Sequence, residues 1–319
     1  MILGSPTVIV LGAAGFVGRH TARVLAAEGC RVLGLGHGRW TESEWRQWGL
    51  VKWLDADIGI ESIDQIAANA QPSCIIHCGG SGAVSFSYSH PLQDFERAVH
   101  STAQVLEWIR LRAQAVCRFV LVSSAAVYGD QGDTDASENS SRAPISPYGV
   151  HKLVAESICE SYSRFFDVSS SIVRLFSVYG EGLRKQLLWD ALNKFQTGQR
   201  QFFGTGNELR DWVHVQDAAR LLALAGLAPQ SSFEVYNGGL EHASTRNVLS
   251  QLAAAYGLDP DLIFNGETLK GNPRRLTANC GHTMRLLNWS PEVRLDEGLA
   301  RYVAWFKALP VEGRVDGTA

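Results

Sequence analysis

The chain has 319 residues, of which 45% are hydrophobic and 19% are charged, and its formal net charge is -3. These values are typical of folded domains and exclude long disordered segments, and the lack of a Lys- or Arg-rich cluster argues against a nucleic-acid partner. No apolar segment approaches the roughly 20 residues that a membrane-spanning helix requires, and we find no secretory signal pattern, so we expect a cytoplasmic protein that does not bind membranes. The six cysteines are scattered without metal-ligand spacing, so we predict no metal site.

Short apolar segments alternate with longer amphipathic segments over residues 1–176. The apolar segments are continuous runs, which is typical of strands whose sheet is covered on both faces. The alternation predicts an α/β fold with a Rossmann-type doubly wound parallel sheet and a dinucleotide-binding domain at 1–176. The expected strands are Thr7–Leu11, Arg31–Leu35, Val51–Leu54, Cys74–His77, Arg118–Val122 and Ser171–Leu175.

A glycine-rich turn follows the first expected strand and precedes a helical segment. It reads Gly12-Ala-Ala-Gly15-Phe16-Val17-Gly18. In this strand-turn-helix context, the first glycine permits a tight turn, the second lets the backbone approach a diphosphate, and the third lets the helix pack closely on the strand. We therefore predict that these residues bind a dinucleotide.

The end of the second expected strand carries no acidic residue. It continues into His37 and Arg39, which could contact the 2′-phosphate of a dinucleotide. This pattern favours NADP(H), with NAD(H) as the alternative. Asp57 and Ile58 follow the third strand, where we expect a hydrogen-bond acceptor and an apolar cover for the adenine ring.

Three further residues have the chemistry of proton transfer. Tyr148 and Lys152 are four residues apart, a spacing that places both side chains on one face of a helix. A lysine cation beside the phenol is expected to lower the tyrosine pKa toward a useful range. Ser124 ends the fifth strand, at the sheet edge where ligands of open α/β folds bind. We predict that these three residues are catalytic.

The regular alternation weakens after residue 176. We predict a smaller, mainly substrate-binding region at 177–310 and a frayed tail at 311–319. Phe233–Tyr236 is expected to return to the main sheet as a strand. The expected helices of the region lie near Leu187–Thr197, Gln216–Ala228, Thr245–Tyr256 and Asp296–Leu309.

Along nearly its whole length, the chain resembles the extended short-chain dehydrogenases/reductases, specifically the nucleotide-sugar epimerase/dehydratase/reductase family. The glycine-rich turn and the Tyr148 to Lys152 spacing carry part of this resemblance. The other matching stretches are Ser123–Gly129, Val173–Gly180, Arg210–Asp217, Tyr236–Gly239 and Leu287–Pro291.

The resemblance implies a nucleoside-diphosphate sugar as the substrate. It implies that the catalytic Ser, Tyr and Lys act at a sugar hydroxyl or ketone and that the Lys also holds the nicotinamide ribose. Arg210 and Arg274 are the implied diphosphate ligands, and we also predict that Ser85, Ser124 and Ser177 contact the substrate. The resemblance also implies a homodimer joined by a four-helix bundle, to which each subunit contributes Pro91–Arg112 and Tyr148–Phe166.

Departures from the family pattern narrow the expected reaction. Ala125 and Ala126 stand where the resembling dehydratases carry Asp-Glu, so an acid and base for eliminating water are missing. We predict NADPH-dependent reduction of a nucleoside-diphosphate 4-keto-(6-deoxy) sugar. The alternative is an NAD(P)-dependent 4-epimerase, and a third hypothesis is a non-catalytic dinucleotide-binding protein.

Overall fold

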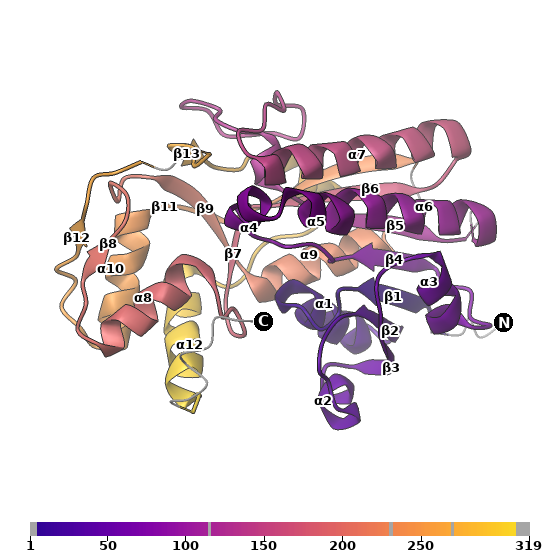
Figure 1. Ribbon diagram of the computed structural model, residues 1–319, viewed down its shortest axis with the longest axis horizontal. Coiled ribbons are helices and arrows are strands. Elements are labelled where there is room, and N and C mark those ends of the chain that lie inside the picture. Colours follow the sequence, from indigo (N-terminus) through magenta and orange to yellow (C-terminus); the bar gives the residue numbers. More distant parts are fainter. Residues whose placement is uncertain (1–4, 114–115, 230–231, 269–270, 311–319) are drawn as a thin grey trace.

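The computed structural model describes residues 5–113, 116–229, 232–268 and 271–310, so the tail predicted at 311–319 lies outside the described residues. Seven strands form the main sheet in the order β10-β6-β5-β4-β1-β2-β3, and every pairing is parallel (Figure 1). This order confirms the Rossmann-type doubly wound fold, including the returning strand. The strands are β1 Thr7–Leu11, β2 Arg31–Gly36, β3 Leu50–Asp55, β4 Cys74–His77, β5 Arg118–Ser124, β6 Ser170–Leu175 and β10 Phe233–Gly238.

Helices cover both faces of this sheet, as its apolar strands require. In β1, Val8 and Val10 pack in one buried cluster, whereas Ile9 and Leu11 pack in another on the opposite face. The first face is covered mainly by α1 (Phe16–Ala27) and α9 (Val215–Leu227). The second is covered by α3 (Ile60–Ala67), α6 (Ser101–Arg112) and α7 (Pro147–Phe166).

Shorter helical segments complete this part of the chain. α11 packs against β10, and α4 and α5 pack against α7. A π-helical turn, η1, joins α5 to α6, and a 3-10 turn, η2, follows β5. Their bounds are α2 Glu42–Gln47, α4 Val84–Ser89, α5 Pro91–Phe95, η1 Glu96–His100, η2 Ala125–Val127 and α11 Gly281–Leu287.

The position of α9 differs from the sequence-based expectation. The helix expected near Gln216–Ala228 was assigned to the smaller region, but α9 packs on α1 and on the strands of the main sheet. The reason lies in its small residues: a Cβ added to Gly226 would lie 3.0 Å from Cys74 Sγ. A helix with small residues on its buried face can approach a sheet closely, which the apolar periodicity alone did not reveal.

A separate layer of structure lies beside the carboxyl ends of the main strands (Figure 1). Three helices pack around a third hydrophobic cluster that contains Trp189, Leu249 and Phe306. Ser244 caps one of these helices by accepting a hydrogen bond from the Asn247 N–H, and Gly257 ends it in the left-handed conformation. The helices are α8 Gln186–Gln196, α10 Thr245–Tyr256 and α12 Leu295–Ala308, and the strands are β7 Ser177–Tyr179, β8 Gln201–Phe202, β9 Leu209–His214, β11 Glu241–Ser244, β12 Ile263–Phe264 and β13 Arg275–Leu276.

The strand order places the binding crevice. The order reverses between β1 and β4, which are hydrogen-bonded neighbours in the sheet. Ligands of open α/β sheets bind at such a switch point, outside the carboxyl ends of the strands.

Across the described ranges, no helix has the length and apolar character to cross a bilayer.

Candidate active site

Two glycines of the turn between β1 and α1 lie where a side chain would not fit. Gly12 has a φ of +72°, and a Cβ added to it would lie 2.9 Å from the Gly79 nitrogen. A Cβ on Gly18 would lie only 2.2 Å from the Gly12 carbonyl oxygen. The helix begins after Gly15 with no side-chain cap and no acidic residue in its first turn. Its free N–H groups therefore suit the diphosphate of a dinucleotide.

We expect Gly18→Ala to lose most of the bound dinucleotide and to lower stability by about 1–3 kcal/mol, because the added methyl group overpacks the turn. The measurements are cofactor content after purification and chemical denaturation. Gly59→Ala is the control, because its Cβ would first meet the flexible side chain of Gln104, at 3.3 Å. Normal cofactor content in Gly18→Ala would contradict this account of the turn.

A cleft of about 700 Å³ runs from the glycine-rich turn across the ends of the main strands. The segment after β4, the end of β5, the first turn of α7, the start of α8 and β9 contribute residues to its walls. The cleft therefore lies between the main sheet and the layer built around α8, α10 and α12. Phe16, Val17, Ser124, Tyr148 and Lys152, which the sequence nominates as catalytic or cofactor-binding residues, all line it.

The first turn of α7 sets the geometry of the predicted catalytic residues. Ser146 caps the helix by accepting from the Gly149 N–H, and Pro147 occupies the first helical position. Lys152 Nζ donates to the Val122 carbonyl at 3.0 Å and lies 5.9 Å from the centroid of the Tyr148 ring. The Tyr148 hydroxyl forms a hydrogen bond with the Ser124 side chain. The structure thus brings the three side chains together.

The pKa of Tyr148 differs from the expectation. Burial raises the pKa of this phenol to about 12, although the hydrogen bond with Ser124 acts in the opposite direction. Burial also lowers the pKa of Lys152. The prediction that the nearby lysine lowers the Tyr148 pKa is therefore wrong, because desolvation by burial dominates and raises it.

A buried ion pair holds together the helix and the strand that carry the catalytic residues. Arg174 donates two hydrogen bonds to the Glu156 carboxylate, at 2.9 and 2.7 Å, and Ser123 donates a third at 2.6 Å. Glu156 lies one helical turn after Lys152 on α7, and Ser123 precedes Ser124 on β5. The pair therefore fixes the catalytic helix against the strand that carries the catalytic serine.

Two carboxylates lie close to the residue that follows β2. His37 follows β2, and its ring nitrogens lie 3.2 Å from Asp55 Oδ1 and 2.8 Å from Asp57 Oδ1. These carboxylates raise the His37 pKa, chiefly through the hydrogen bond with Asp57. Arg39 is exposed nearby. The end of β2 itself carries no acidic residue. However, β3 pairs with β2, so the carboxylates of Asp55 and Asp57, at and just after the end of β3, lie close to the end of β2.

Five residues were predicted to bind substrate, and one of them, Ser124, lines the cleft as described above. The other four divide into two groups. Ser177 and Arg210 line the cleft. Ser85 instead lies exposed on α4, and Arg274 directs its guanidinium to Asp133 in an exposed ion pair, so neither is among the residues that line the cleft. Arg274 was assigned from family resemblance and Ser85 from its position after Gly79 and Gly80, and neither observation specifies the local path of the segment. Ile58 lies beside Gly79, where an added Cβ would approach its Cδ1 to 2.7 Å.

Arg210 is held by the segment that precedes β13. Its guanidinium donates to the carbonyls of Leu209 and Pro273 and to the Asn272 side chain. The neighbouring Asp211 is buried and accepts from the backbone N–H groups of Leu240 and Ala278. These contacts join β9 to β11 and β13 beneath the position of Arg210.

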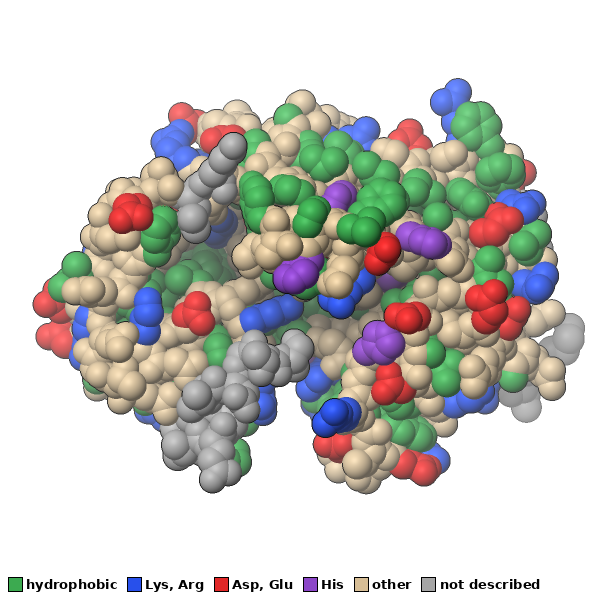
Figure 2. Space-filling view, in the orientation of Figure 1, with side chains coloured by type: hydrophobic (Ala, Val, Ile, Leu, Met, Phe, Trp, Pro, Cys, Tyr) green, Lys and Arg blue, Asp and Glu red, His purple; other side chains and the backbone are tan. Residues whose placement is uncertain are grey.

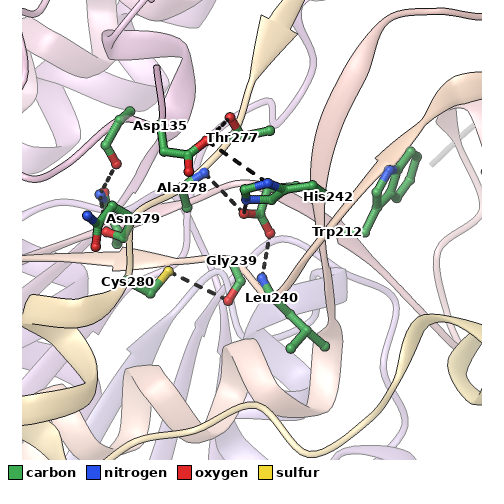
Figure 3. Close-up of polar contacts among 12 residues, drawn as sticks. Asp135, Trp212, Gly239, Leu240, His242, Thr277, Ala278, Asn279 and Cys280 are labelled. Atoms are coloured by element: carbon green, nitrogen blue, oxygen red, sulfur yellow. Dashed lines mark hydrogen bonds and ion pairs between the residues drawn. The ribbon is translucent and has the colours of Figure 1, made fainter. Parts of the chain in front are cut away.

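His242 extends this network. Its Nε2 lies 3.1 Å from Asp211 Oδ2, and its Nδ1 lies 4.0 Å from Asp135 Oδ1 (Figure 3). The hydrogen bond with Asp211, followed by the charges of Asp211 and Asp135, raises the pKa of His242. His242 therefore links β11 to the segment that carries Asp135.

The raised His242 pKa predicts a pH-dependent contribution to stability. The contribution should be fully present below the unfolded pKa of about 6.5 and should disappear as the pH rises through the higher folded pKa. We expect His242→Gln to reduce the free energy of unfolding more at pH 6 than at pH 9. Urea denaturation of both proteins at the two pH values measures the difference, and an equal loss at both would contradict the prediction.

The comparison with protein families decides the assignment. A family model described as "NAD dependent epimerase/dehydratase family" matches residues 8–239. The chain belongs to this family.

Individual relatives match between about three fifths of the chain and nearly all of it. The uncharacterized UDP-glucose epimerase YtcB of Bacillus subtilis is 31% identical over 201 residues, which span 62% of this chain and 63% of that protein. The UDP-glucuronate 4-epimerase of Thermodesulfobacterium geofontis is 27% identical over 94% of this chain and 95% of its own length. The crystal structure of the UDP-glucuronic acid 4-epimerase from Bacillus cereus, in complex with UDP-glucuronic acid and NAD, has a TM-score of 0.83 and 26% identity, and the match covers 94% of this chain and 99% of that one.

This member of the epimerase/dehydratase family has polar contacts around the cleft that the sequence analysis did not identify. Glu181 accepts from His214 Nε2 at 2.8 Å and from Arg301 Nε at 3.0 Å, and its carbonyl lies 2.9 Å from His20 Nε2 on α1. Burial raises the Glu181 pKa, but the hydrogen bond from His214 and other contacts lower it to about 2. The contacts tie α1 to β9 and α12.

Two side chains of the next segment reach across the cleft. Lys185 Nζ donates to the Ser81 carbonyl at 3.2 Å, and Gln186 Nε2 donates to the Gly82 carbonyl at 2.9 Å. They connect the start of α8 to the segment after β4. No sequence motif marks these partners, which are more than a hundred residues apart along the chain.

Proposed function

We propose that this protein is an NAD-dependent nucleotide-sugar 4-epimerase whose substrate is a UDP-hexose or UDP-hexuronate. The observation that carries the proposal is the grouping of Ser124, Tyr148 and Lys152 in a cleft that also contains the glycine-rich turn. The relatives named above are UDP-sugar epimerases, and they favour the epimerase alternative over the 4-ketoreductase.

The residues of the site suit reversible oxidation at the sugar C4. Tyr148, hydrogen-bonded to Ser124, takes the proton of the C4 hydroxyl, while the hydride leaves C4. When bound, the nicotinamide ring supplies the acceptor for that hydride and later returns it. The keto sugar then presents its other face, and Tyr148 gives back the proton. Ala125 and Ala126 provide no acid or base for a competing elimination.

We propose NAD as the resident cofactor, in place of the NADP(H) favoured by the sequence analysis. Gly12, Gly15 and Gly18 provide the diphosphate turn, and Phe16, Val17, Ile58, Tyr148 and Lys152 provide contacts along the cofactor. Asp55 and Asp57 support this choice, because two carboxylates that already bind His37 would repel a 2′-phosphate. The Bacillus cereus relative was also solved with NAD.

We propose that Arg210 and Ser177 contact the nucleoside-diphosphate sugar. Burial lowers the Arg210 pKa, and its position in the cleft wall suits a diphosphate.

The test of the proposed function combines two measurements on the purified protein: identification of the cofactor released by denaturation, and chromatography of UDP-glucose and UDP-glucuronate after incubation. Released NAD with formation of the 4-epimer supports the proposal. Empty protein that consumes added NADPH with a 4-keto sugar would overturn it.

We further propose a homodimer. The exposed hydrophobic side chains Leu92, Phe95, Val150 and Val154 lie on α5 and α7, which pack together, and Figure 2 shows hydrophobic side chains gathered over this part of the molecule. A second copy of this chain would cover them with the same face in a four-helix arrangement. Sedimentation should give a dimer for the natural protein and a folded monomer for Val154→Glu, and a monomeric natural protein would contradict this proposal.

A further inference from the structure

A buried carboxylate that the proposed mechanism does not use lies beside the catalytic helix. Asp94, at the end of α5, is 1% exposed. Its Oδ1 accepts a short hydrogen bond from the Ser81 hydroxyl, and its Oδ2 lies 2.7 Å from His151 Nδ1. His151 is also nearly covered, with 15% of its side chain exposed and its ring packed edge-on against Phe95.

One partner of Asp94 lies on the catalytic helix, and the other lines the cleft. His151 lies on α7 between Tyr148 and Lys152. Ser81 lines the cleft in the segment after β4, where a Cβ added to the adjacent Gly80 would lie 3.5 Å from Lys152 Nζ. The carboxylate therefore ties the segment after β4 to the catalytic helix.

We propose that Asp94 and His151 form a positioning pair for the reaction. The pair holds the cleft wall at Ser81 against α7, and the charge of the Asp94 carboxylate sets the pH range in which Tyr148 exchanges its proton. The proposal rests on the 4-epimerase function proposed above. Neither residue touches the sugar in this account, and both act through Tyr148 and Lys152.

The electrostatics of the site agree with this geometry. Burial is the main cause of the high Tyr148 pKa, and the Asp94 charge raises it further. The same charge raises the Lys152 pKa against the larger effect of burial. Removing the Asp94 charge should therefore make the Tyr148 phenolate easier to form.

Other titratable groups on the surrounding elements limit how large this effect can be. Glu156 is already paired with Arg174, and Lys185 donates to the Ser81 carbonyl. Burial raises the pKa of Cys78 and lowers that of His77, so both are neutral near pH 7. The other titratable residues on the helical segments packed around α7, and at the junction between α4 and α5, are Tyr88, His90, Glu96, Arg97, His100, Glu107, Arg110 and Arg112.

The first test is Asp94→Asn in the purified enzyme with its cofactor. The amide keeps an oxygen for Ser81, and a change of His151 tautomer keeps the second hydrogen bond, so mainly the charge is removed. The acid limb of the kcat profile should move to lower pH by on the order of half a unit, because Tyr148 ionises more easily. An unchanged acid limb would overturn the role of the charge.

A spectroscopic titration gives the same answer without turnover. The ultraviolet difference between a protein and its Tyr148→Phe counterpart isolates the Tyr148 phenolate. We expect the phenolate midpoint to be lower in the Asp94→Asn background than in the natural background. Equal midpoints would overturn the proposal even if no sugar is turned over, whereas a lowered midpoint in a protein inactive on all UDP-sugars would contradict only the proposed function.

The second test separates positioning from charge. His151→Ala removes the donor to Asp94 and should lower kcat about tenfold with little change in KM, because the sugar contacts remain. His151→Asn places an amide N–H near the position of Nδ1 and should recover most of kcat. Equal activity of His151→Ala and the natural enzyme, or failure of Asn to recover activity in a folded protein, would overturn the positioning role.

Discussion

Tyr148→Phe is expected to lower kcat by about 10²–10⁴-fold, the range that a positioned general acid-base contributes. The change removes only the phenolic oxygen that hydrogen-bonds to Ser124, so the ring and its packing remain. NAD content and stability should stay near the values of the natural protein. The measurements are initial rates of UDP-sugar epimerisation at saturating substrate and the cofactor released on denaturation.

A matched substitution controls for general effects of losing a tyrosine hydroxyl. Tyr256→Phe removes a hydroxyl at the end of α10, on a residue outside the lining of the cleft. This variant should keep kcat within about twofold. If both variants keep full activity, Tyr148 is not the proton-transfer group, and the assignment of the site is wrong.

Glu156→Leu is expected to lower the free energy of unfolding by about 3–5 kcal/mol, because it leaves the Arg174 cation buried without its carboxylate. The side chains of this pair are 0% and 2% exposed. The loss of the Ser123 hydrogen bond adds to the effect and should loosen the contact between β5 and α7. Urea denaturation measures the change, and kcat should fall with it because Ser124 and Lys152 are carried by the same elements.

Two further variants test whether the loss of stability comes from the buried ion pair. Replacing Arg174 by Met in the Glu156→Leu background should recover part of the lost stability, because no uncompensated charge remains. Glu42→Ala breaks an exposed pair with Arg46 and should change stability by no more than the error of the measurement. If the double substitution is less stable than Glu156→Leu, the unpaired cation is not the source of the loss.

Much of the fold could be predicted from the sequence because strongly patterned segments form the main sheet. The runs at Thr7–Leu11 and Cys74–His77 appear with the expected bounds, and Phe233–Gly238 returns to pair with β6. The packing of α9 could not be predicted in the same way. Its apolar residues suit either layer, and only the close approach of Gly226 to Cys74 reveals which one it covers.

The residues of the site also differ in how far the sequence could predict them. Gly12, Tyr148 and Lys152 have fixed spacings within one segment, so a local pattern identifies them. The carboxylates near His37, the Asp94 contact with His151 and the reach of Lys185 to Ser81 depend on which segments meet in space. Such partners leave no local signal, which explains why the expected NADP(H) preference did not foresee that Asp55 and Asp57 lie against His37.

The most direct test of the proposed epimerase uses a UDP-sugar substrate that carries deuterium at C4. The account predicts that the 4-epimer forms with the deuterium retained at C4, because the same bound NAD accepts and returns the hydride. NAD⁺ added to the reaction should not be converted to deuterium-labelled NADH. Transfer of the label to free coenzyme, or net oxidation of added NADPH with a 4-keto sugar, would contradict the account and indicate a reductase.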